Sequence, residues 1–275
     1  MLTHWGIMIS GGFCWEKRNM PNVIDTPPEN LQPDTASVLG LPIHLLEDYN
    51  GWLLERLAKG TAGVHVVTLN AEMAMQAEQD AALAAVIRQA DLVIPDGAGV
   101  VFYLRLRGRK VSRCPGIELS EKLLSQSVAG DRPGSPYSVF FFGGAPGVAE
   151  DAARVWRERA PGIAIAGVQH GYIAPEEQAP LLETLKQLQP RIILVGLGVP
   201  RQEFWIAQHR HLCPYAVWIG VGGSFDIWSG KKERAPGWLR NNNLEWVYRL
   251  YQEPWRWRRM LALPQFAWRS LVFRG

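Results

Sequence analysis

The sequence contains few cysteines, and their placement argues against the sites that cysteine pairs build. Cys14, Cys114 and Cys213 lie far apart among 275 residues and form no Cys-x-x-Cys pair. Such usage disfavours a zinc ribbon or a disulfide framework and suits a reducing compartment. Apolar runs are also short, since none approaches the ~18 residues that cross a bilayer. Charges follow the apolar patch Trp5–Trp15 rather than precede it, which is the wrong order for a secretory signal, so we expect a cytoplasmic protein.

Several motifs of nucleotide-binding and metal enzymes are missing. The chain has no Walker A sequence, no His-Glu-x-x-His and no Gly-x-Ser-x-Gly elbow. Gly196-Leu197-Gly198 begins a dinucleotide fingerprint but continues with Val, Pro and Arg, so the third glycine is absent. No metal site is predicted at His209 and His211, because an i, i+2 spacing points two imidazoles apart on a helix. A nucleotide-dependent dehydrogenase is therefore only the alternative enzyme class.

The net positive charge is small overall but is concentrated at the C-terminus. The net charge is +3, yet residues 231–275 hold ten Lys/Arg against three Asp/Glu, together with five of the twelve tryptophans. Mixed tryptophan and arginine are typical of a helix at a membrane interface with anionic lipid. A helical lid packed on the core with solvated arginines is the other interpretation, and both can hold. We expect an anionic membrane partner and no nucleic acid.

Strand-like apolar runs alternate with helical segments through the middle of the chain. This alternation predicts an α/β fold, a Rossmann-like parallel sheet with helices on both faces. The pattern stops near Gly230. We therefore expect a poorly structured, proline-containing extension over 1–36, a catalytic domain over 37–230, and a small basic, mainly helical appendage over 231–275. The strands are predicted at Ser37–Leu41, Val64–Leu69, Ala90–Pro95, Tyr137–Phe142, Ile163–Val168, Arg191–Val195 and Tyr215–Ile219.

The stretch from Val64 to Gly97 reads as strand, helix, strand. Asn70 is a plausible N-cap for one helix that runs to the second strand. Thr68, Asn70 and Asp96 then lie where the strands of one parallel pair end, the edge at which open α/β sheets bind ligands. Taken alone, the stretch favours an ordinary βαβ unit in which these are strand, cap and turn residues.

Three glycine-rich turns follow predicted strands at the same edge. They contain Gly143-Gly144, Gly196-x-Gly198 and Gly220-x-Gly222-Gly223. One such turn is most simply a tight connection from a strand to a helix. Three of them beside Thr68, Asn70 and Asp96 favour a phosphate-bearing or nucleotide ligand, because glycine lets the backbone approach closely and the next helix offers N–H donors.

Four side chains near these turns have chemistry that suits sugar or phosphate transfer. Asp96 can act as a general base if partial burial poises its pKa. Asn70 and Gln202 can present amides to sugar hydroxyls, since an amide both donates and accepts. Arg113 can neutralise phosphate, although a solvated arginine in a basic loop is the simpler interpretation.

Several specific blocks follow one another in order from about Ser37 to Pro254. They are Thr68-Leu69-Asn70-Ala71-Glu72, the run Ala90 to Gly97, Arg113-Cys114-Pro115-Gly116-Ile117-Glu118-Leu119, His170-Gly171-Tyr172, the run Val195 to Glu203, Gly220-Val221-Gly222-Gly223-Ser224-Phe225-Asp226, Arg234-Ala235-Pro236 and Leu244-Glu245-Trp246. Together these blocks resemble the WecG/TagA/CpsF glycosyltransferases of bacterial surface-polymer synthesis. Cys114 and Glu118 stand where that family more often has valine and aspartate, and Glu233 interrupts a usually basic pair.

The resemblance implies an inverting transfer of a sugar, often N-acetylmannosamine, from a UDP donor to N-acetylglucosamine on a polyprenyl diphosphate. It implies that Asp96 is the base that deprotonates the acceptor hydroxyl. It further implies substrate contacts and nucleotide contacts, which we extend to the glycine turns and the basic segment. The expected substrate-binding residues are Thr68, Asn70, Arg113, Gln202 and Arg234, and the expected nucleotide-binding residues are Gly143, Gly144, Tyr172, Gly198, Gly222, Gly223 and Asp226.

The family's basic C-terminal segment implies peripheral attachment to the inner face of the cell membrane. No Asp-x-Asp pair occurs in the chain, so the metal-chelating motif of many nucleotide-sugar transferases is absent and we expect a metal-independent enzyme without a cofactor. A non-catalytic nucleotide-sugar-binding module of a polysaccharide assembly is the non-enzyme alternative. A homo-oligomer is compatible with the sequence, which leaves the oligomeric state and the donor sugar open.

Overall fold

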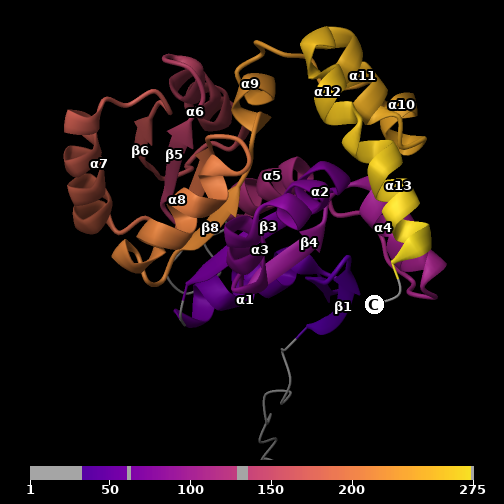
Figure 1. The fold of residues 1–275 in the computed structure, drawn as a ribbon. Helices are drawn as coiled ribbons and strands as arrows, with labels where there is room; N and C mark the ends of the chain where they lie inside the picture. The colour runs from indigo at the N-terminus through magenta and orange to yellow at the C-terminus, as the bar shows by residue number, and fades with distance from the viewer. Residues whose placement is uncertain (1–32, 61–62, 129–135, 274–275) are drawn as a thin grey trace, which may run out of the picture. The chain divides into compact units, whose positions relative to one another are not determined.

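A six-stranded, wholly parallel sheet forms the centre of the fold in a computed structural model that describes residues 33–60, 63–128 and 136–273 (Figure 1). The strand order is β4-β3-β8-β7-β5-β6. This sheet confirms the predicted α/β class, and the limits of its strands differ from the predicted ones by no more than two residues. The strands are β3 (Val64–Leu69), β4 (Leu92–Pro95), β5 (Val139–Gly143), β6 (Ile165–Gln169), β7 (Ile192–Gly196) and β8 (Val217–Gly220).

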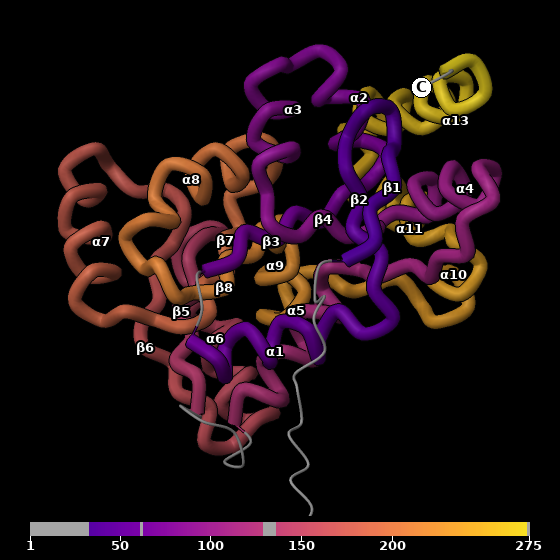
Figure 2. The backbone as a smooth tube through the Cα atoms, turned by 90° about the horizontal axis from the view of Figure 1, so that it is seen from below, coloured from indigo at the N-terminus to yellow at the C-terminus, as the bar shows by residue number. Residues whose placement is uncertain are grey.

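Helices cover both faces of the sheet. In Figure 2, α3 and α8 lie on one side of the strands, and α1, α5 and α6 lie on the other. The strands between them are largely apolar and, apart from the half-buried edge strand β6, almost fully buried, as expected when both faces of a parallel sheet are covered. The helices of this part are α1 (Tyr49–Lys59), α2 (Ala71–Gln79), α3 (Ala81–Arg88), α4 (Ala98–Leu106), α5 (Gly116–Gln126), α6 (Val148–Arg159), α7 (Pro175–Leu188), α8 (Arg201–His209), the short 3-10 helix η1 (Arg210–Leu212) and α9 (Ser224–Trp228).

The first strand predicted from the sequence, Ser37–Leu41, is instead a hairpin. Its antiparallel strands are β1 (Asp34–Val38) and β2 (Leu41–Leu45), and Leu39 and Gly40 at the turn both have positive φ. The strand β1 thus begins within the predicted extension 1–36, whose residues 1–32 lie outside the described residues. The hairpin covers the edge of the sheet, because the backbone N–H of Val93 donates to Nδ1 of His44. Burial lowers the pKa of His44, which keeps this nitrogen free to accept.

The single helix predicted after Asn70 is two helices, α2 and α3, joined at Asp80. The Asp80 backbone is extended and its N–H closes α2 on the carbonyl of Gln76. Its side chain then accepts from the N–H groups of Ala82 and Leu83 and starts α3. Aspartate competes for backbone N–H groups in this way, so a polar residue inside an amphipathic run ends one helix and caps the next.

All described elements beyond α9 are helical. They are α10 (Gly237–Asn241), α11 (Glu245–Gln252), the 3-10 helix η2 (Pro254–Arg256), α12 (Trp257–Met260) and α13 (Ala262–Val272). The last of these packs against α2 and α4, where Phe266 is buried beside Tyr103 and Arg269 forms an ion pair with Glu78 (Figure 1). Among the helices that the structure describes, none combines the length and the apolar character of a membrane span.

Candidate active site

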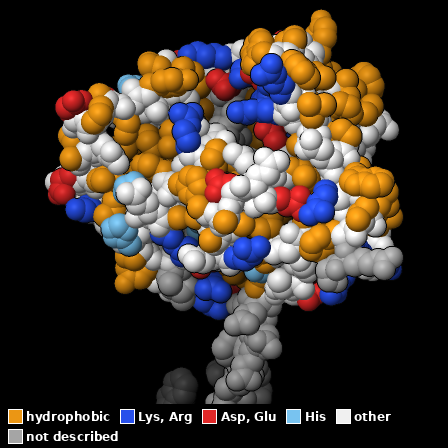
Figure 3. All heavy atoms as spheres, in the orientation of Figure 1, with side chains coloured by type: hydrophobic (Ala, Val, Ile, Leu, Met, Phe, Trp, Pro, Cys, Tyr) orange, Lys and Arg blue, Asp and Glu red, His pale blue; other side chains and the backbone are white. Residues whose placement is uncertain are grey.

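A cavity opens at the carboxyl edge of the sheet, between the ends of β3, β4 and β8 and the C-terminal helices. We call it the glycine-turn cavity. Figure 3 shows a hollow on this side of the molecule with basic and acidic side chains around its mouth. The structure brings eight of the sequence-predicted residues to the lining of this cavity, namely Thr68, Asn70, Asp96, Gly198, Gln202, Gly222, Gly223 and Arg234.

Thr68 and Asn70 are fixed by the end of β3. The Thr68 hydroxyl donates to the carbonyl of Gly220 at the end of β8, which ties the two strand ends together. Asn70 caps α2 as predicted, because its side chain accepts from the N–H of Met73. A Cβ on Gly97 would lie only 2.9 Å from the Asn70 Cβ, so glycine is needed where the ends of β3 and β4 meet.

Asp96 follows β4 and is partly exposed to the cavity. Its Oδ1 accepts from the N–H of Gly116, at the start of α5. Burial raises the pKa of Asp96, and the nearby charge of Arg249 and the Gly116 hydrogen bond partly oppose this effect. A carboxyl group with a raised pKa is suited to take up a proton near neutral pH.

A buried chain of hydrogen bonds holds Gln202, and this network was not predicted from the sequence. The Gln202 carbonyl oxygen accepts from the N–H of Gly222, and its amide nitrogen donates to Oε1 of Glu203. Oε2 of Glu203 lies 2.9 Å from Nε2 of His65 on β3. All three side chains are at most 2 % exposed, so the network fixes the glycine turn after β8. The one available signal is the presence of His65 within an otherwise apolar buried strand.

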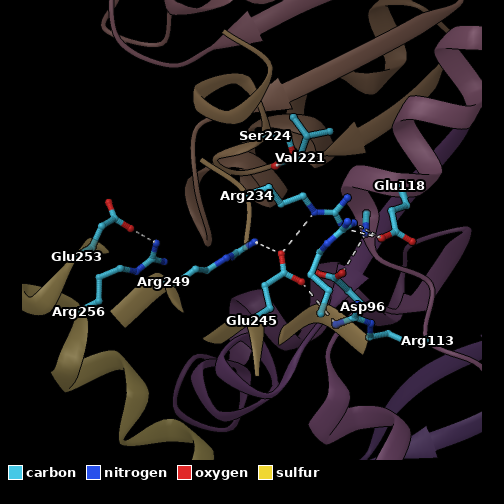
Figure 4. Close-up of polar contacts among 12 residues, drawn as sticks. Asp96, Arg113, Glu118, Val221, Ser224, Arg234, Glu245, Arg249, Glu253 and Arg256 are labelled. Carbon is cyan, nitrogen blue, oxygen red and sulfur yellow. Dashed lines mark hydrogen bonds and ion pairs between the residues drawn. The ribbon is translucent and has the colours of Figure 1, made fainter. Parts of the chain in front are cut away.

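Arginine and glutamate side chains lie around Asp96 (Figure 4). Glu245 of α11 lies 3.6 to 3.7 Å from the guanidinium groups of Arg113, Arg234 and Arg249. Arg234 also donates to Glu118 at 2.6 Å. Glu118, one of the departures from the family pattern, is therefore a partner of this cationic group. The carboxylates hold the guanidinium groups close together, which like charges would otherwise resist.

Arginines line the cavity, and Arg234 and Arg256 are among them. A guanidinium group matches phosphate geometry. The cavity is therefore chemically suited to a phosphate group.

The other predicted residues lie outside this lining. Arg113 faces an adjoining groove, and Asp226 forms an ion pair with Lys232, which does line the cavity. Gly143 packs so closely on Gly196 that a Cβ would lie 2.5 Å from its backbone, and Gly144 donates to the Gly196 carbonyl. Both glycines thus have a structural reason to be present, while Tyr172 is 70 % exposed. Nucleotide contacts at Gly143, Gly144, Tyr172 and Asp226 stay predictions.

Metal-ligating side chains do not gather in the part of the chain that the structure describes. No three His, Cys, Asp or Glu residues there form a group that could hold an ion. Nδ1 of His209 instead lies 2.9 Å from the Trp205 carbonyl of its own helix.

Removal of the Glu203 carboxylate should destabilise the protein. Glu203→Ala leaves His65 and the Gln202 amide without their buried partner, and we expect a loss of roughly 2–5 kcal/mol in the free energy of unfolding. Glu203→Gln retains an acceptor and should lose less. Urea unfolding measures both, and the exposed Glu150→Ala on α6 is the control. An unchanged midpoint for Glu203→Ala would show that the network does not support the fold.

Comparison with known proteins agrees with this architecture. Residues 36–274 match the Glycosyl transferase WecG/TagA/CpsF family. The chain is similar to proteins named N-acetylglucosaminyldiphosphoundecaprenol N-acetyl-beta-D-mannosaminyltransferase. That of Bacillus spizizenii is 41% identical over 74% of this chain and 77% of its own. That of Bacillus subtilis is 37% identical over 74% and 78%, and that of Staphylococcus aureus is 34% identical over 77% and 81%. The chain therefore belongs to the WecG/TagA/CpsF family of glycosyltransferases.

Proposed function

We propose that this protein transfers an N-acetyl-β-D-mannosaminyl group from a UDP donor to N-acetylglucosamine on a polyprenyl diphosphate. The names of its relatives support the acceptor and the sugar transferred. The observation that carries the proposal is the position of Asp96, a carboxyl group of raised pKa at the edge of a cavity lined by glycine turns and arginines. Family membership favours this activity over the dehydrogenase alternative.

The reaction is proposed to proceed with inversion in one displacement. Asp96 takes the proton of the acceptor hydroxyl as its oxygen attacks the anomeric carbon of the donor. The bond from that carbon to the diphosphate breaks on the opposite face, and UDP leaves with the electron pair. The guanidinium groups of Arg234 and Arg256 and the backbone near Gly222 and Gly223 line the cavity and are suited to stabilise the negative charge that develops on the leaving group.

Product analysis with a panel of UDP-sugars tests this function. We expect the purified enzyme to transfer N-acetylmannosamine to a lipid-diphosphate-N-acetylglucosamine acceptor and to release UDP, with equal rates in EDTA and in Mg²⁺. The comparison of EDTA with Mg²⁺ tests our proposal that arginines, rather than a metal ion, balance the negative charge of the diphosphate. Loss of activity in EDTA and its rescue by Mg²⁺ would contradict metal independence. Binding of a donor without transfer to any acceptor would support a non-catalytic module.

Asp96→Asn tests the proposed base. We expect the turnover rate to fall by about 10²- to 10⁴-fold while UDP affinity stays near that of the wild type. In the wild type, the rate should fall as the pH drops through the raised pKa of Asp96, because the protonated carboxyl cannot accept a proton. The midpoint of this acidic decline in rate should lie at a higher pH than the ordinary pKa of aspartate. The residual activity of the Asn variant should not show the decline. An unaltered pH profile would exclude Asp96 as the base.

Thermal unfolding of the same variant separates chemistry from stability. A raised folded-state pKa means that ionisation of Asp96 opposes folding, so its stabilising contribution is complete at low pH and is lost as the pH rises through that pKa. Asn cannot ionise, so the variant should be at least as stable as the wild type at neutral pH.

We propose that the C-terminal helices bind the cytoplasmic face of an anionic membrane. Large apolar side chains are exposed on them beside arginines such as Arg258 and Arg259. These apolar side chains are Trp238, Trp246, Val247, Tyr251, Trp255, Trp257, Leu261, Trp268, Leu271 and Val272. Tryptophan beside arginine is typical of segments that lie at the headgroup level of a bilayer.

Full-length Trp255→Ser/Trp268→Ser tests the membrane contact. Burial of two tryptophans in the bilayer interface contributes to the free energy of membrane binding. The double variant should therefore bind anionic phosphatidylglycerol vesicles at least about tenfold more weakly than the wild type. High salt should weaken binding of the wild type. Tyr215→Ser, which removes an exposed aromatic side chain just before β8, is the control for lost apolar surface. Equal co-sedimentation of all three proteins with vesicles would refute the proposal.

A further inference from the structure

A second cavity adjoins the glycine-turn cavity and differs from it in chemistry. We call it the apolar groove. It lies between α4 on one side and α11, α12 and α13 on the other, and Figure 1 shows α13 beside α4. Its apolar lining consists of Ala98, Gly99, Phe102, Trp246, Met260, Leu263, Phe266 and Ala267.

The two cavities meet at the proposed catalytic residue. Both are lined by Asp96, Asn70 and Glu72, and by the charged residues Glu245, Arg249, Arg256 and Arg259 of the C-terminal helices. Arg113, which does not line the glycine-turn cavity, lines the apolar groove at this end. A ligand that enters the groove from its far end would therefore pass apolar side chains first, then arginines, and then the Asp96 carboxyl group.

The apolar walls run along the helices away from Asp96. Phe102 lies one helical turn beyond Ala98 on α4, which is about 6 Å further from the end of β4. Phe102 and Trp246 are 56 % and 41 % exposed, so large apolar side chains of the lining are left uncovered within the described part of the chain. Exposed apolar surface of this kind marks a binding site when it is contiguous and rimmed by polar residues.

The wall formed by α13 is held in place at its middle and at its C-terminal end. Arg269 binds Glu78 of α2 through three hydrogen bonds of 2.7 to 3.1 Å, and Arg107 at the end of α4 donates to the carbonyl of Phe273. Phe266 is 2 % exposed and packs on Tyr103. The groove is therefore built by fixed helices, and Leu263 and Ala267 line it from the same face of α13 as Phe266.

We propose that the apolar groove binds the isoprene units of the acceptor nearest to its diphosphate. This inference rests on the proposed function, because it assumes a lipid-linked acceptor. The arginines at the inner end suit the diphosphate, and the sugar then reaches Asp96 from the side opposite the donor. A membrane surface is not the occupant we assign, because Trp268 and Val272 of α13 are 66 % and 50 % exposed on the helix face away from the groove.

Soluble acceptors in detergent-free solution test the groove apart from the membrane. The two probes are N-acetylglucosamine diphosphate carrying a three-isoprene chain and the same compound carrying a methyl group. For the wild type we expect kcat/KM to be at least about tenfold higher with the isoprenoid, because several buried carbons contribute to binding. The difference should lie in the KM of the acceptor.

Two variants of the groove lining should abolish the preference for the isoprenoid acceptor over the methyl acceptor, and they do so by opposite means. Leu263→Ser removes apolar surface, and Ala267→Phe fills the groove from an exposed position that should not disturb folding. In both, the ratio of kcat/KM for the two acceptors should approach one, while the KM for the donor is unchanged. Val272→Ser is the matched control on the outward face of α13 and should keep the wild-type ratio.

The outcomes separate this inference from the proposed function. A wild-type ratio near one, or equal ratios in the Leu263, Ala267 and Val272 variants, would overturn the groove as the isoprenoid site while sugar transfer stands. Absence of transfer to either acceptor, with transfer also absent from a long-chain acceptor in vesicles, would overturn the proposed function and the groove with it.

Discussion

The pairing of β3 with β8 is the constraint on which the rest of the site depends. It joins segments separated by 152 positions, and the hydrogen bond from Thr68 to the Gly220 carbonyl lies at its end. Because β4 pairs with the other edge of β3, the turn after β8 and Asp96 come to the same edge of the sheet. The buried Gln202, Glu203 and His65 side chains then link α8, β3 and the turn after β8. One strand placement thus assembles residues from three distant parts of the chain.

Charge in the site is balanced by the protein itself. Glu245 lies between Arg113, Arg234 and Arg249, and Glu118 holds Arg234 from the opposite side. Carboxylates in this position offset repulsion within the cationic group and set its geometry. The same cluster surrounds Asp96, whose pKa is raised by burial and lowered in part by Arg249. The C-terminal helices therefore contribute to the electrostatics of the sheet domain.

The C-terminal helices present apolar surface in two directions. On α13, Phe266 packs into the core while Trp268 and Val272 face outward. Side chains three or four positions apart share a helix face, so one short helix can cover the groove and also expose tryptophan. The interpretations of this segment as a packed lid and as an interfacial surface are thus compatible in one structure.

The sequence by itself determined the alternation of strands and helices, the cap at Asn70, and the position of Thr68 and Asp96 at strand ends. These features are local, since they depend on periodicity and on the chemistry of single residues. It could not separate α2 from α3, because Asp80 lies in an amphipathic pattern that continues across it. Only the tertiary structure decided the strand order. The strand order in turn brings Gln202 and Arg234 close to Asp96 and places Gly143 away from these three residues. Strand order depends on long-range pairing of apolar strands that are nearly alike in sequence, and so no local pattern encodes it.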